Sequence, residues 1–442
     1  MRIPLKAKFT YEQKAFWIDQ CQQLNSLINC AIYATRQAYY ASLEECDNYF
    51  TTHWRGDELR HGWKIYHCKT TCLQLDKILK NNPHYKAMAP QSARQMLKSV
   101  GESITSYNKL VALYYQGDVH KPSLPKYRKG GSFAAVTFPR QALTWKNGCF
   151  YPSIRKKTKP ELLTEITLQL PNLIDSHWVK EVTIKPYLGE FWIDWVIDNC
   201  NKPVNTNPEL DYSQGWSFDH RGTNWLTGVS TRGKSLIIDG RTLKSINQGY
   251  CPLVAKYKQN KFDFYWDSNL DRVQLQRNNQ MQHAINKAAR FIINQCLNDR
   301  IGNLIIGCNH GQKNSSKMSK CGSQNFVSIP TGGLIERLKQ ICPEYGIKIT
   351  IGDYLYKHGE KLDGWKPSGQ RVKRGLYKTS AGILANAYCN GAANILTKVA
   401  TQLGANLAKV GRGALTLPIR VDLFNGLSRS YPKGCVPRLQ PG

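Results

Sequence analysis

A polar segment near the middle of the chain separates two halves whose hydrophobic patterns differ. The segment NKPVNTNPELDYSQG, residues 201–215, contains two prolines. Composition of this kind is typical of a linker between domains. Because the chain has 442 residues, of which 41% are hydrophobic, it is long enough to form two or three domains with separate cores.

The half before the linker changes pattern once. Residues from about 10 to 117 have apolar side chains spaced three and four apart, as in FWIDQCQQLNSLINCAIYATRQAYYASL, which predicts helices. From QGDVHKPSLPKYRKGGSFAAVTFP onward Pro, Gly and β-forming residues become frequent, and alternating runs predict antiparallel strands to about residue 200. We therefore expect a helical block followed by a small barrel or sheet.

The half after the linker alternates short apolar runs with amphipathic stretches. WSFDHRGTNWLTGVSTRGKSLIIDG predicts two strands with a turn at Arg232-Gly233, and IGNLIIGC and IKITIGDYLY predict two more strands. Helices are predicted at about 273–298, in LIERLKQICPEYG, and in ILANAYCNGAANILTKVATQL as the closing helix. Strands and helices in this alternation indicate an α/β domain.

The charge of the chain is strongly positive, with 61 Lys and Arg against 31 Asp and Glu and a formal net charge of +30. Such a charge attracts polyanions, of which nucleic acid and an anionic membrane surface are the two candidates. The 23 Tyr and 11 Trp often stand beside basic residues, as in LPKYRKGG, and this combination favours nucleic acid. For any single lysine, a solvated surface position is the simpler interpretation.

Two further features concern the compartment. No apolar run reaches the roughly 20 residues that span a bilayer, and MRIPLKAKFTYEQKAFW lacks the apolar centre of a signal peptide. We therefore expect no membrane partner and a cytoplasmic protein. The 14 cysteines are scattered and form no C-x-x-C pair, so we expect small buried residues in a reducing compartment.

Carboxylates at strand ends are the candidate catalytic residues of the α/β domain. Asp219 ends a predicted strand in WSFDHRG, and Asp353 ends another in KITIGDYLY. Acids that converge at such an edge can hold two Mg²⁺ ions for phosphodiester cleavage, because Mg²⁺ prefers oxygen ligands.

Six stretches of the sequence carry a resemblance to a known family. They are NPHYKAMAPQSARQMLKSV (82–100), LPKYRKGGSFAAVTFP (124–139), FDHRGTNWLTGVS (218–230), NLIIGCNHGQKN (303–314), SQNFVSIP (323–330) and QRVKRGLYKTSAGILANAYCNGAANIL (370–396). In this order they resemble the TnpB family of transposon-encoded RNA-guided nucleases and its relatives, the compact type V CRISPR effectors.

The resemblance implies an α+β multidomain fold, in which a helical recognition lobe is inserted in a wedge-type β-barrel and a RuvC-like α/β domain of RNase H fold follows. The implied boundaries are 1–10 for the first strand of the wedge barrel, 11–117 for the lobe, 118–205 for the barrel and 206–442 for the RuvC-like domain, with a short basic insert at about 357–378.

The resemblance also implies the partners. Members of this family bind a guide RNA and a target double-stranded DNA, which they identify by a short flanking motif and by guide pairing. Transposition or regulatory proteins are compatible with this role as further partners. A bacterial protein that associates with the nucleoid when bound to DNA is implied.

The catalytic positions of the family match this chain only in part. Asp219 matches the first Asp, although Arg221 stands where a Gly is usual. Gly307 follows the strand after which many members have a Glu, and Asp353 is the nearest carboxylate to the Glu of another subgroup. Tyr388 replaces the third acid, and a tyrosine is neutral at pH 7 and is not an anionic Mg²⁺ ligand.

The sequence therefore predicts RNA-guided, sequence-specific binding of double-stranded DNA without cleavage, which would serve repression or the recruitment of partners. The alternative is an active RNA-guided, Mg²⁺-dependent DNA endonuclease whose site is rearranged around Asp219, Asp353 and Asp422. A third interpretation is the product of a decaying transposon reading frame. Mg²⁺ is expected only if the nuclease is active.

The short insert KHGEKLDGWKPSGQRVKRG has one His and no Cys, whereas many relatives carry paired zinc-binding cysteines there. We therefore expect no zinc. Its Arg371, Lys373 and Arg374 are candidates for contact with phosphates, with a solvated loop as the alternative.

Further candidates for nucleic-acid contact lie on two helices and a loop, where exposed polar side chains without a specific contact are the alternative. They are Gln91, Arg94 and Gln95 in the helix begun by Pro90, Lys126, Arg128 and Lys129 in PKYRKGG, and Arg277, Lys287 and Arg290 in the helix at about 274–297.

Overall fold

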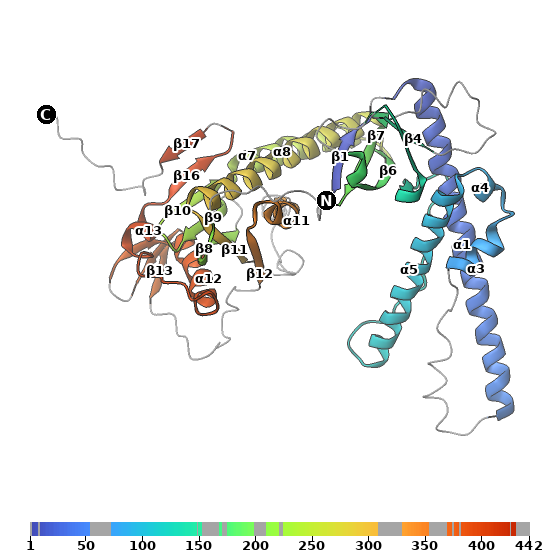
Figure 1. The fold of residues 1–442 in the computed structure, drawn as a ribbon, viewed down its shortest axis with the longest axis horizontal. Helices are drawn as coiled ribbons and strands as arrows, with labels where there is room; N and C mark the ends of the chain where they lie inside the picture. The colour runs from blue at the N-terminus through green and yellow to red at the C-terminus, as the bar shows by residue number, and fades with distance from the viewer. Residues whose placement is uncertain are drawn as a thin grey trace. The chain divides into compact units, whose positions relative to one another are not determined.

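The computed structural model describes residues 2–7, 9–53, 72–147, 149–152, 168–169, 175–198, 209–220, 224–307, 329–352, 369–373, 375–379, 382–424 and 426–429. The chain forms two compact units, Met1–Asn201 and Lys202–Gly442 (Figure 1). Each unit contains helices and sheets, so the protein is a mixed α/β chain of more than one domain.

The first unit is built on a four-stranded antiparallel sheet that includes the start of the chain. Its order is β1 (Arg2–Lys6), β7 (Glu190–Ile197), β6 (Val179–Tyr187) and β2 (Val136–Pro139). A second sheet contains β3 (Leu143–Lys146), β4 (Cys149–Pro152) and β5 (Leu168–Gln169). Leu5 pairs with Ile193, so the unit closes through contacts between distant parts of the sequence.

In the described residues between β1 and β2, the chain forms four helices. They are α1 (Tyr11–His53), α3 (Cys72–Leu79), α4 (Pro83–Lys86) and α5 (Pro90–Tyr115). Trp17 of α1 is 1% exposed and meets Phe138 of β2 edge to face, with ring centroids 6.2 Å apart. Aromatic contacts of this kind join the helices to the sheet in one core.

The second unit is built on a seven-stranded mixed sheet. Its order is β12 (Lys348–Gly352), β11 (Ile301–Gly307), β8 (Asp211–His220), β9 (Asn224–Ser230), β10 (Ser235–Asp239), β16 (Ile419–Asp422) and β17 (Gly426–Arg429). Strand β9 is antiparallel to β8 and β10, while the pairs β8–β11, β11–β12 and β10–β16 are parallel. Five strands therefore run in one direction.

Helices cover both faces of this sheet. The helices α7 (Arg241–Lys258), α8 (Ser268–Asn298) and α11 (Thr331–Ile341) share a core with Trp216 and Phe218 of β8. On the other face lies α12 (Ala387–Leu403), where the Ser217 hydroxyl donates to the Ala392 carbonyl at 2.7 Å. Because both faces are covered, β8 is buried continuously from residue 215 to 220.

A small antiparallel sheet precedes α12. It contains β13 (Gln370–Lys373), β14 (Leu376–Lys378) and β15 (Leu384–Asn386). The Asn386 side chain accepts hydrogen bonds from the backbone N–H groups of Tyr388 and Cys389, at 2.9 and 3.3 Å. This is an N-cap that begins α12 at the end of β15.

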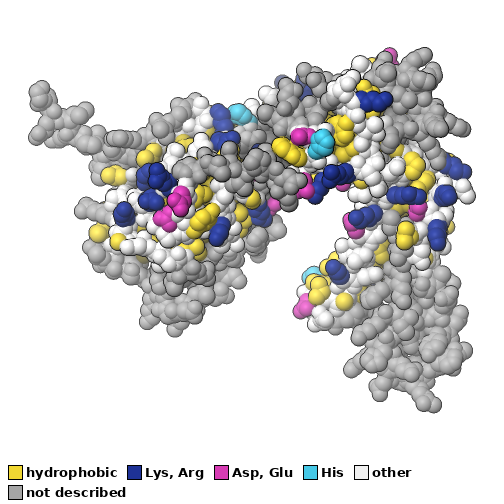
Figure 2. Space-filling model, in the orientation of Figure 1, with side chains coloured by type: hydrophobic (Ala, Val, Ile, Leu, Met, Phe, Trp, Pro, Cys, Tyr) yellow, Lys and Arg dark blue, Asp and Glu magenta, His cyan; other side chains and the backbone are white. Residues whose placement is uncertain are grey.

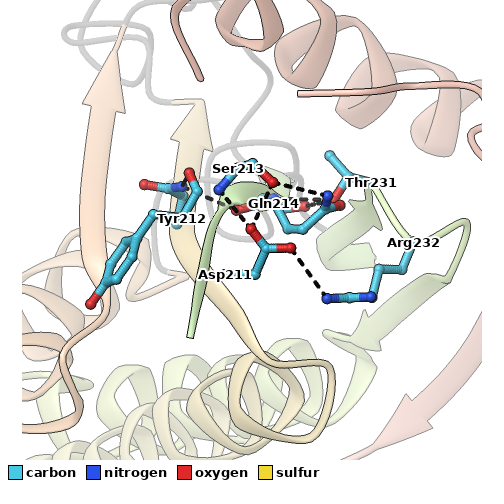
Figure 3. A network of polar contacts seen from close by, with 8 residues as sticks. Asp211, Tyr212, Ser213, Gln214, Thr231 and Arg232 are labelled. Atoms are coloured by element: carbon cyan, nitrogen blue, oxygen red, sulfur yellow. Dashed lines mark hydrogen bonds and ion pairs between the residues drawn. The ribbon is translucent and has the colours of Figure 1, made fainter. Parts of the chain in front are cut away.

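A polar network anchors the start of β8 (Figure 3), whereas Asp219 lies near the other end of the same strand. The Asp211 carboxylate accepts from the Ser213 N–H at 2.9 Å and its hydroxyl at 2.6 Å, and pairs with Arg232 at 3.6 Å. The hydrogen bonds from Ser213 hold the pKa of Asp211 below its ordinary value. Because Arg232 lies in the turn between β9 and β10, the network ties that turn to β8.

The structure corrects several sequence-based expectations in the second unit. The region 216–240 contains three strands instead of two, because the chain turns a first time between β8 and β9 before the turn at Arg232-Gly233. Residues 211–215, assigned to the linker, already belong to β8. The helix at residue 387 does not close the chain, because α13 (Arg412–Thr416), β16 and β17 follow it.

No helix in the described part of the chain combines the length and the apolar character that crossing a bilayer requires.

The close approach of β8 and β9 predicts an effect of Gly228→Ala. A Cβ at Gly228 would lie 2.5 Å from Cε1 of Phe218, and overpacking in a well-filled core costs about 1–3 kcal/mol. We expect a lower free energy of unfolding by about that amount, measured by urea denaturation.

Gly249 is the matched control. It lies inside α7 with no atom within 4 Å of the position of a Cβ, so Gly249→Ala is expected to stabilise the protein by about 0.5–1 kcal/mol. Equal effects of the two substitutions would contradict this description of the core.

Candidate functional site

The carboxyl ends of five strands meet at one edge of the seven-stranded sheet. Because β8, β10, β11, β12 and β16 run in the same direction, their last residues lie along this edge. Four residues at the carboxyl ends of these strands lie there: Asp219 of β8, Asp239 of β10, Gly307 of β11 and Asp422 of β16. Asp353, which follows β12, lies outside the described residues, as does Arg221.

Asp219 is buried beneath the first turns of α12. It is 1% exposed, and its cross-strand partner Thr227 is fully buried. A Cβ at Gly391 of α12 would lie 3.1 Å from Oδ2 of Asp219. The helix can therefore approach the carboxylate closely because residue 391 has no side chain, and the amino end of a helix favours a negative charge.

Gly307 lies at a position where the side chain of Ile395 takes up the space next to the backbone. A Cβ there would lie 2.5 Å from Cδ1 of Ile395 on α12. The carbonyl of Gly307 is hydrogen-bonded to Nδ1 of His220 at 2.9 Å. An acid at this position would require Ile395 to move, so the lack of an acid is matched by packing around it.

Tyr388 lies in the first turn of α12 and is half-buried. Its ring faces the turn between β13 and β14, where a Cβ at Gly375 would lie 3.7 Å from Cε2 of Tyr388. The structure thus brings Asp219 and Gly391 together, while the Tyr388 ring packs near Gly375.

A divalent metal needs several oxygen ligands from converging side chains. Within the ranges that the structure describes, no three His, Cys, Asp or Glu side chains are grouped so that they could hold a metal ion. The described residues at this edge therefore supply Asp219, Asp239 and Asp422 as separate carboxylates and not as one group of ligands.

Arginines neutralise the neighbouring part of the edge. Asp239 pairs with Arg241 at 2.6 Å and with Arg420 at 3.0 Å, and Arg420 also donates to Asn224 at 3.1 Å. Burial raises the pKa of the Asp239 carboxyl, but hydrogen bonds from Arg241 and the positive charges of Arg420 and Arg241 outweigh burial and hold the pKa below its ordinary value. The side chain is therefore an anion that stabilises the fold.

A cysteine is buried beneath the same helix. Cys389 is fully buried, and burial raises the pKa of its thiol to about 12, against the opposing effect of a hydrogen bond with Ser235. A thiol with so high a pKa is unreactive and behaves as a small apolar group.

The basic loop after α5 is held on α1 by its backbone. The carbonyls of Lys129, Arg128 and Pro125 accept hydrogen bonds from Asn25, Asn29 and Arg36 of α1, at 3.1, 3.0 and 2.9 Å. The side chains of Lys126, Arg128 and Lys129 are exposed. The loop thus presents three cations from a fixed backbone.

A groove of about 230 Å³ adjoins this loop. Ile28, Met96 and Val100 line its apolar part, and Lys126 and Arg128 line its charged part. The groove lies between α1 and α5, so cations and apolar side chains are side by side there.

Arg94 is engaged within the first unit. Its Nε lies 3.2 Å from Oδ2 of Asp76 on α3, and the Tyr85 hydroxyl donates to the same carboxylate at 2.6 Å. Gln91 and Gln95 are half-buried on the same helix. Arg94 therefore joins α5 to α3, and contact of these three residues with DNA stays a prediction.

The cations predicted on the long helix lie on different faces of α8. Arg277 donates to Asn247 of α7 at 2.8 Å. Lys287 lies 5.2 Å from the ring centre of Phe424, and Arg290 lies 5.3 Å from that of Tyr345. The structure brings Lys287 and Arg290 together and separates them from Arg277.

Lys287 and Arg290 line a groove of about 560 Å³. His283, Asn286 and Asp422 also line it. Both grooves thus place basic side chains beside apolar or aromatic ones, which suits phosphate and base contacts together.

The strand β13 is exposed along its whole length and carries Arg371 and Lys373. Arg374 lies outside the described residues. Figure 2 shows further Lys and Arg side chains at the surface of both units.

Sequence reasoning missed the residues that hold these cations in place. Arg36 stacks on Tyr127 with its guanidinium carbon 4.8 Å from the ring centre. In the same way, Arg290 lies over the Tyr345 ring and Lys287 lies over the Phe424 ring. The partners are about 50 to 140 positions apart in the sequence, so no local pattern connects them.

Comparisons with known proteins gave structural matches only. No protein-family model matches the chain, and no curated protein matches it in sequence. A cryo-EM structure of a Cas12f1–sgRNA–target DNA complex is similar over 78% of this chain and 74% of that chain, with 12% identity and a TM-score of 0.45. A cryo-EM structure of a CRISPR-Cas12f ternary complex is similar over 78% and 72%, with 13% identity and a TM-score of 0.26.

The Asp239 cluster predicts a pH dependence of stability. The pKa of Asp239 is lower in the folded state than in the unfolded state. Its contribution to the free energy of unfolding is therefore complete above the unfolded-state pKa and is lost as the pH falls through the folded-state pKa. Asp239→Asn should cost about 1–3 kcal/mol at neutral pH, since hydrogen bonds to a charged group are lost.

The measurement is the free energy of unfolding from neutral pH down to about pH 3, where the variant should lose less stability than the wild type. Glu102→Gln is the control, because Glu102 is an exposed member of an i,i+4 pair with Lys98. The same slope for wild type and Asp239→Asn would refute the assignment.

Proposed function

We propose that this protein binds double-stranded DNA at sites chosen by a guide RNA and does not cut the DNA. The absence of cleavage is supported by the packing at the carboxyl edge of the seven-stranded sheet, here called the closed edge. There Ile395 occupies the space next to Gly307, and Asp219 is buried against α12. A bound complex of this kind blocks its site or recruits other proteins to it.

The strand order of the second unit supports a RuvC-like domain. β10, β9 and β8 are antiparallel neighbours, and β11 and β12 continue from β8 in parallel. This is the arrangement expected of an RNase H fold. The proposal therefore assigns the role of first acid to Asp219, since the resemblance implies that acid on this strand.

The first unit supports a recognition lobe inserted in a wedge-type barrel. Helices α1, α3, α4 and α5 separate β1 from β2, and both strands belong to the same sheet. The insertion of helices between two strands of one sheet is the organisation that the resemblance to TnpB proteins implies.

The positive charge supports a nucleic-acid partner. Lys126, Arg128 and Lys129 extend from a loop whose backbone is fixed, and Arg371 and Lys373 lie on an exposed strand. Cations on fixed backbone give phosphate contacts that set the position of a bound strand.

The test begins with the RNA that copurifies with the protein from its host. We expect a defined small RNA whose sequence identifies a matching duplex. In a gel-shift assay, the complex should bind this duplex and not a scrambled one, and Mg²⁺ should leave both strands intact.

Removal of the RNA by ribonuclease should abolish specific binding. Mg²⁺-dependent cutting of the matched duplex would refute the absence of cleavage. Failure to copurify any small RNA would instead favour a product that has lost its function.

A second candidate is an endonuclease with a rearranged site. It is favoured by the retention of Asp219 and Asp422 at one edge of the sheet, to which Asp353 would be added. If it is correct, Asp219→Ala and Asp353→Ala each abolish cutting by the same preparation.

The closed edge also predicts the outcome of restoring the lost acids. Tyr388→Asp alone should leave cleavage at background, because the position at Gly307 still has no acid and Ile395 packs against it. Combining Tyr388→Asp with Gly307→Glu and Ile395→Ala should restore Mg²⁺-dependent cutting, measured on the matched duplex.

Asp219→Ala in the restored background is the control, and it should return cutting to background. Full activity of Tyr388→Asp by itself would show that Gly307 is not limiting.

A further inference from the structure

The turn between α7 and α8, residues 259–267 and here called the aromatic tip, exposes large aromatic side chains. Phe264 is 98% exposed, Phe262 is 74% exposed and Trp266 is 44% exposed. A single exposed apolar residue is ordinary, but three within five positions form a patch, which is typical of an interaction site.

Hydrogen bonds hold the aromatic tip in one conformation. The Asp267 carboxylate accepts from the Leu270 N–H at 2.9 Å and from the Tyr265 hydroxyl at 3.2 Å. The indole N–H of Trp266 donates to Asp271 at 2.8 Å. The exposed rings thus project from an ordered turn at the start of α8.

The backbone of the tip is strained where the most exposed ring is attached. Phe264 has φ +67°, and Asn260 has φ +56°. Asn tolerates this left-handed region, whereas a bulky residue such as Phe is an outlier there. Strain that exposes a ring instead of burying it is typical of functional positions.

Cations accompany the rings. Nζ of Lys258 lies 4.9 Å from the ring centre of Trp266, and Nζ of Lys261 lies 5.2 Å from that of Tyr265. Phe262 meets Tyr265 edge to face at 5.4 Å. Aromatic faces next to lysines are the combination that binds single-stranded nucleic acid, because bases stack on the rings while phosphates meet the ammonium groups.

Asp263 decides between the possible partners. It is exposed between Phe262 and Phe264, and a carboxylate is costly to bury in a lipid surface or an apolar protein groove. Beside a nucleic acid it stays solvated and can accept a hydrogen bond from a ribose 2′-hydroxyl, which DNA lacks.

We propose that the aromatic tip binds unpaired bases of RNA. Phe262 and Phe264 stack on the bases, Lys258 and Lys261 contact the phosphates, and Asp263 contacts a 2′-hydroxyl. The inference rests on the proposed function, since it assigns the guide RNA a binding element in the second unit that the family resemblance did not identify.

The test uses the full-length protein freed of nucleic acid and a labelled single-stranded oligouridine of about 12 nucleotides, within the range that single-strand binding sites cover. Phe262→Ala/Phe264→Ala should weaken binding about tenfold or more, since each stacked base contributes strongly. The control Tyr11→Ala removes an 86% exposed aromatic outside the tip and should change the affinity by less than about twofold.

Ultraviolet crosslinking locates the contact directly. Trypsin cuts after Lys261 and Arg272, so uridine should be recovered on the peptide 262–272, and the double variant should lose this adduct. Oligothymidine of the same length should crosslink less, and Asp263→Asn should reduce the difference. An unchanged melting temperature checks that the variants fold.

Equal RNA affinity and equal crosslinking of wild type and double variant would overturn the inference. The inference would also be overturned if the double variant changed self-association, or binding to phosphatidylserine vesicles, while its RNA affinity stayed the same as that of the wild type. Guide-directed DNA binding is measured in parallel to separate the two proposals. If the double variant keeps both guide-directed DNA binding and oligouridine binding, only the role of the aromatic tip is refuted. If the wild type shows no guide-directed DNA binding but binds oligouridine through the tip, only the proposed function is refuted.

Discussion

Contact between α12 and the carboxyl half of β8 is the interaction on which the character of the second unit depends. The Ser217 hydroxyl bonds to the Ala392 carbonyl at 2.7 Å, and Gly391 lets the helix lie against the Asp219 carboxylate. The same helix places Ile395 against Gly307. Helix α12 therefore packs closely against the carboxyl ends of both β8 and β11.

Charge is distributed to match this arrangement. At the edge of the sheet, Asp239 is paired with two arginines. Away from the edge, cations stand on fixed supports, such as the loop held on α1 and the aromatic rings beside Lys287 and Arg290. In the described residues, cations thus stand on supported positions in both units.

Predictability from the sequence differed between local and distant features. The apolar run IGNLIIGC predicts a buried strand and LIERLKQICPEYG predicts an amphipathic helix; the structure confirms the strand at 301–307 and a helix that begins earlier and ends at residue 341. The extra strand within 216–240 was missed because β8 to β10 are buried on both faces, and uniform burial removes the alternation that separates one strand from the next. The strands after α12 were missed because Ile419–Asp422 is short and gains its partner, β10, from a place about 180 residues earlier.

The sequence by itself determined the positive charge, the polar segment that begins at residue 201 and the presence of Tyr388 in the segment that forms the start of α12. These are properties of residues and local patterns. Only the tertiary structure decided that Ile395 packs against Gly307, that Arg94 is paired with Asp76, and that Phe262 and Phe264 are exposed on an ordered turn. Each of these depends on which atoms of distant segments come within a few ångströms, and packing of the whole chain sets those distances.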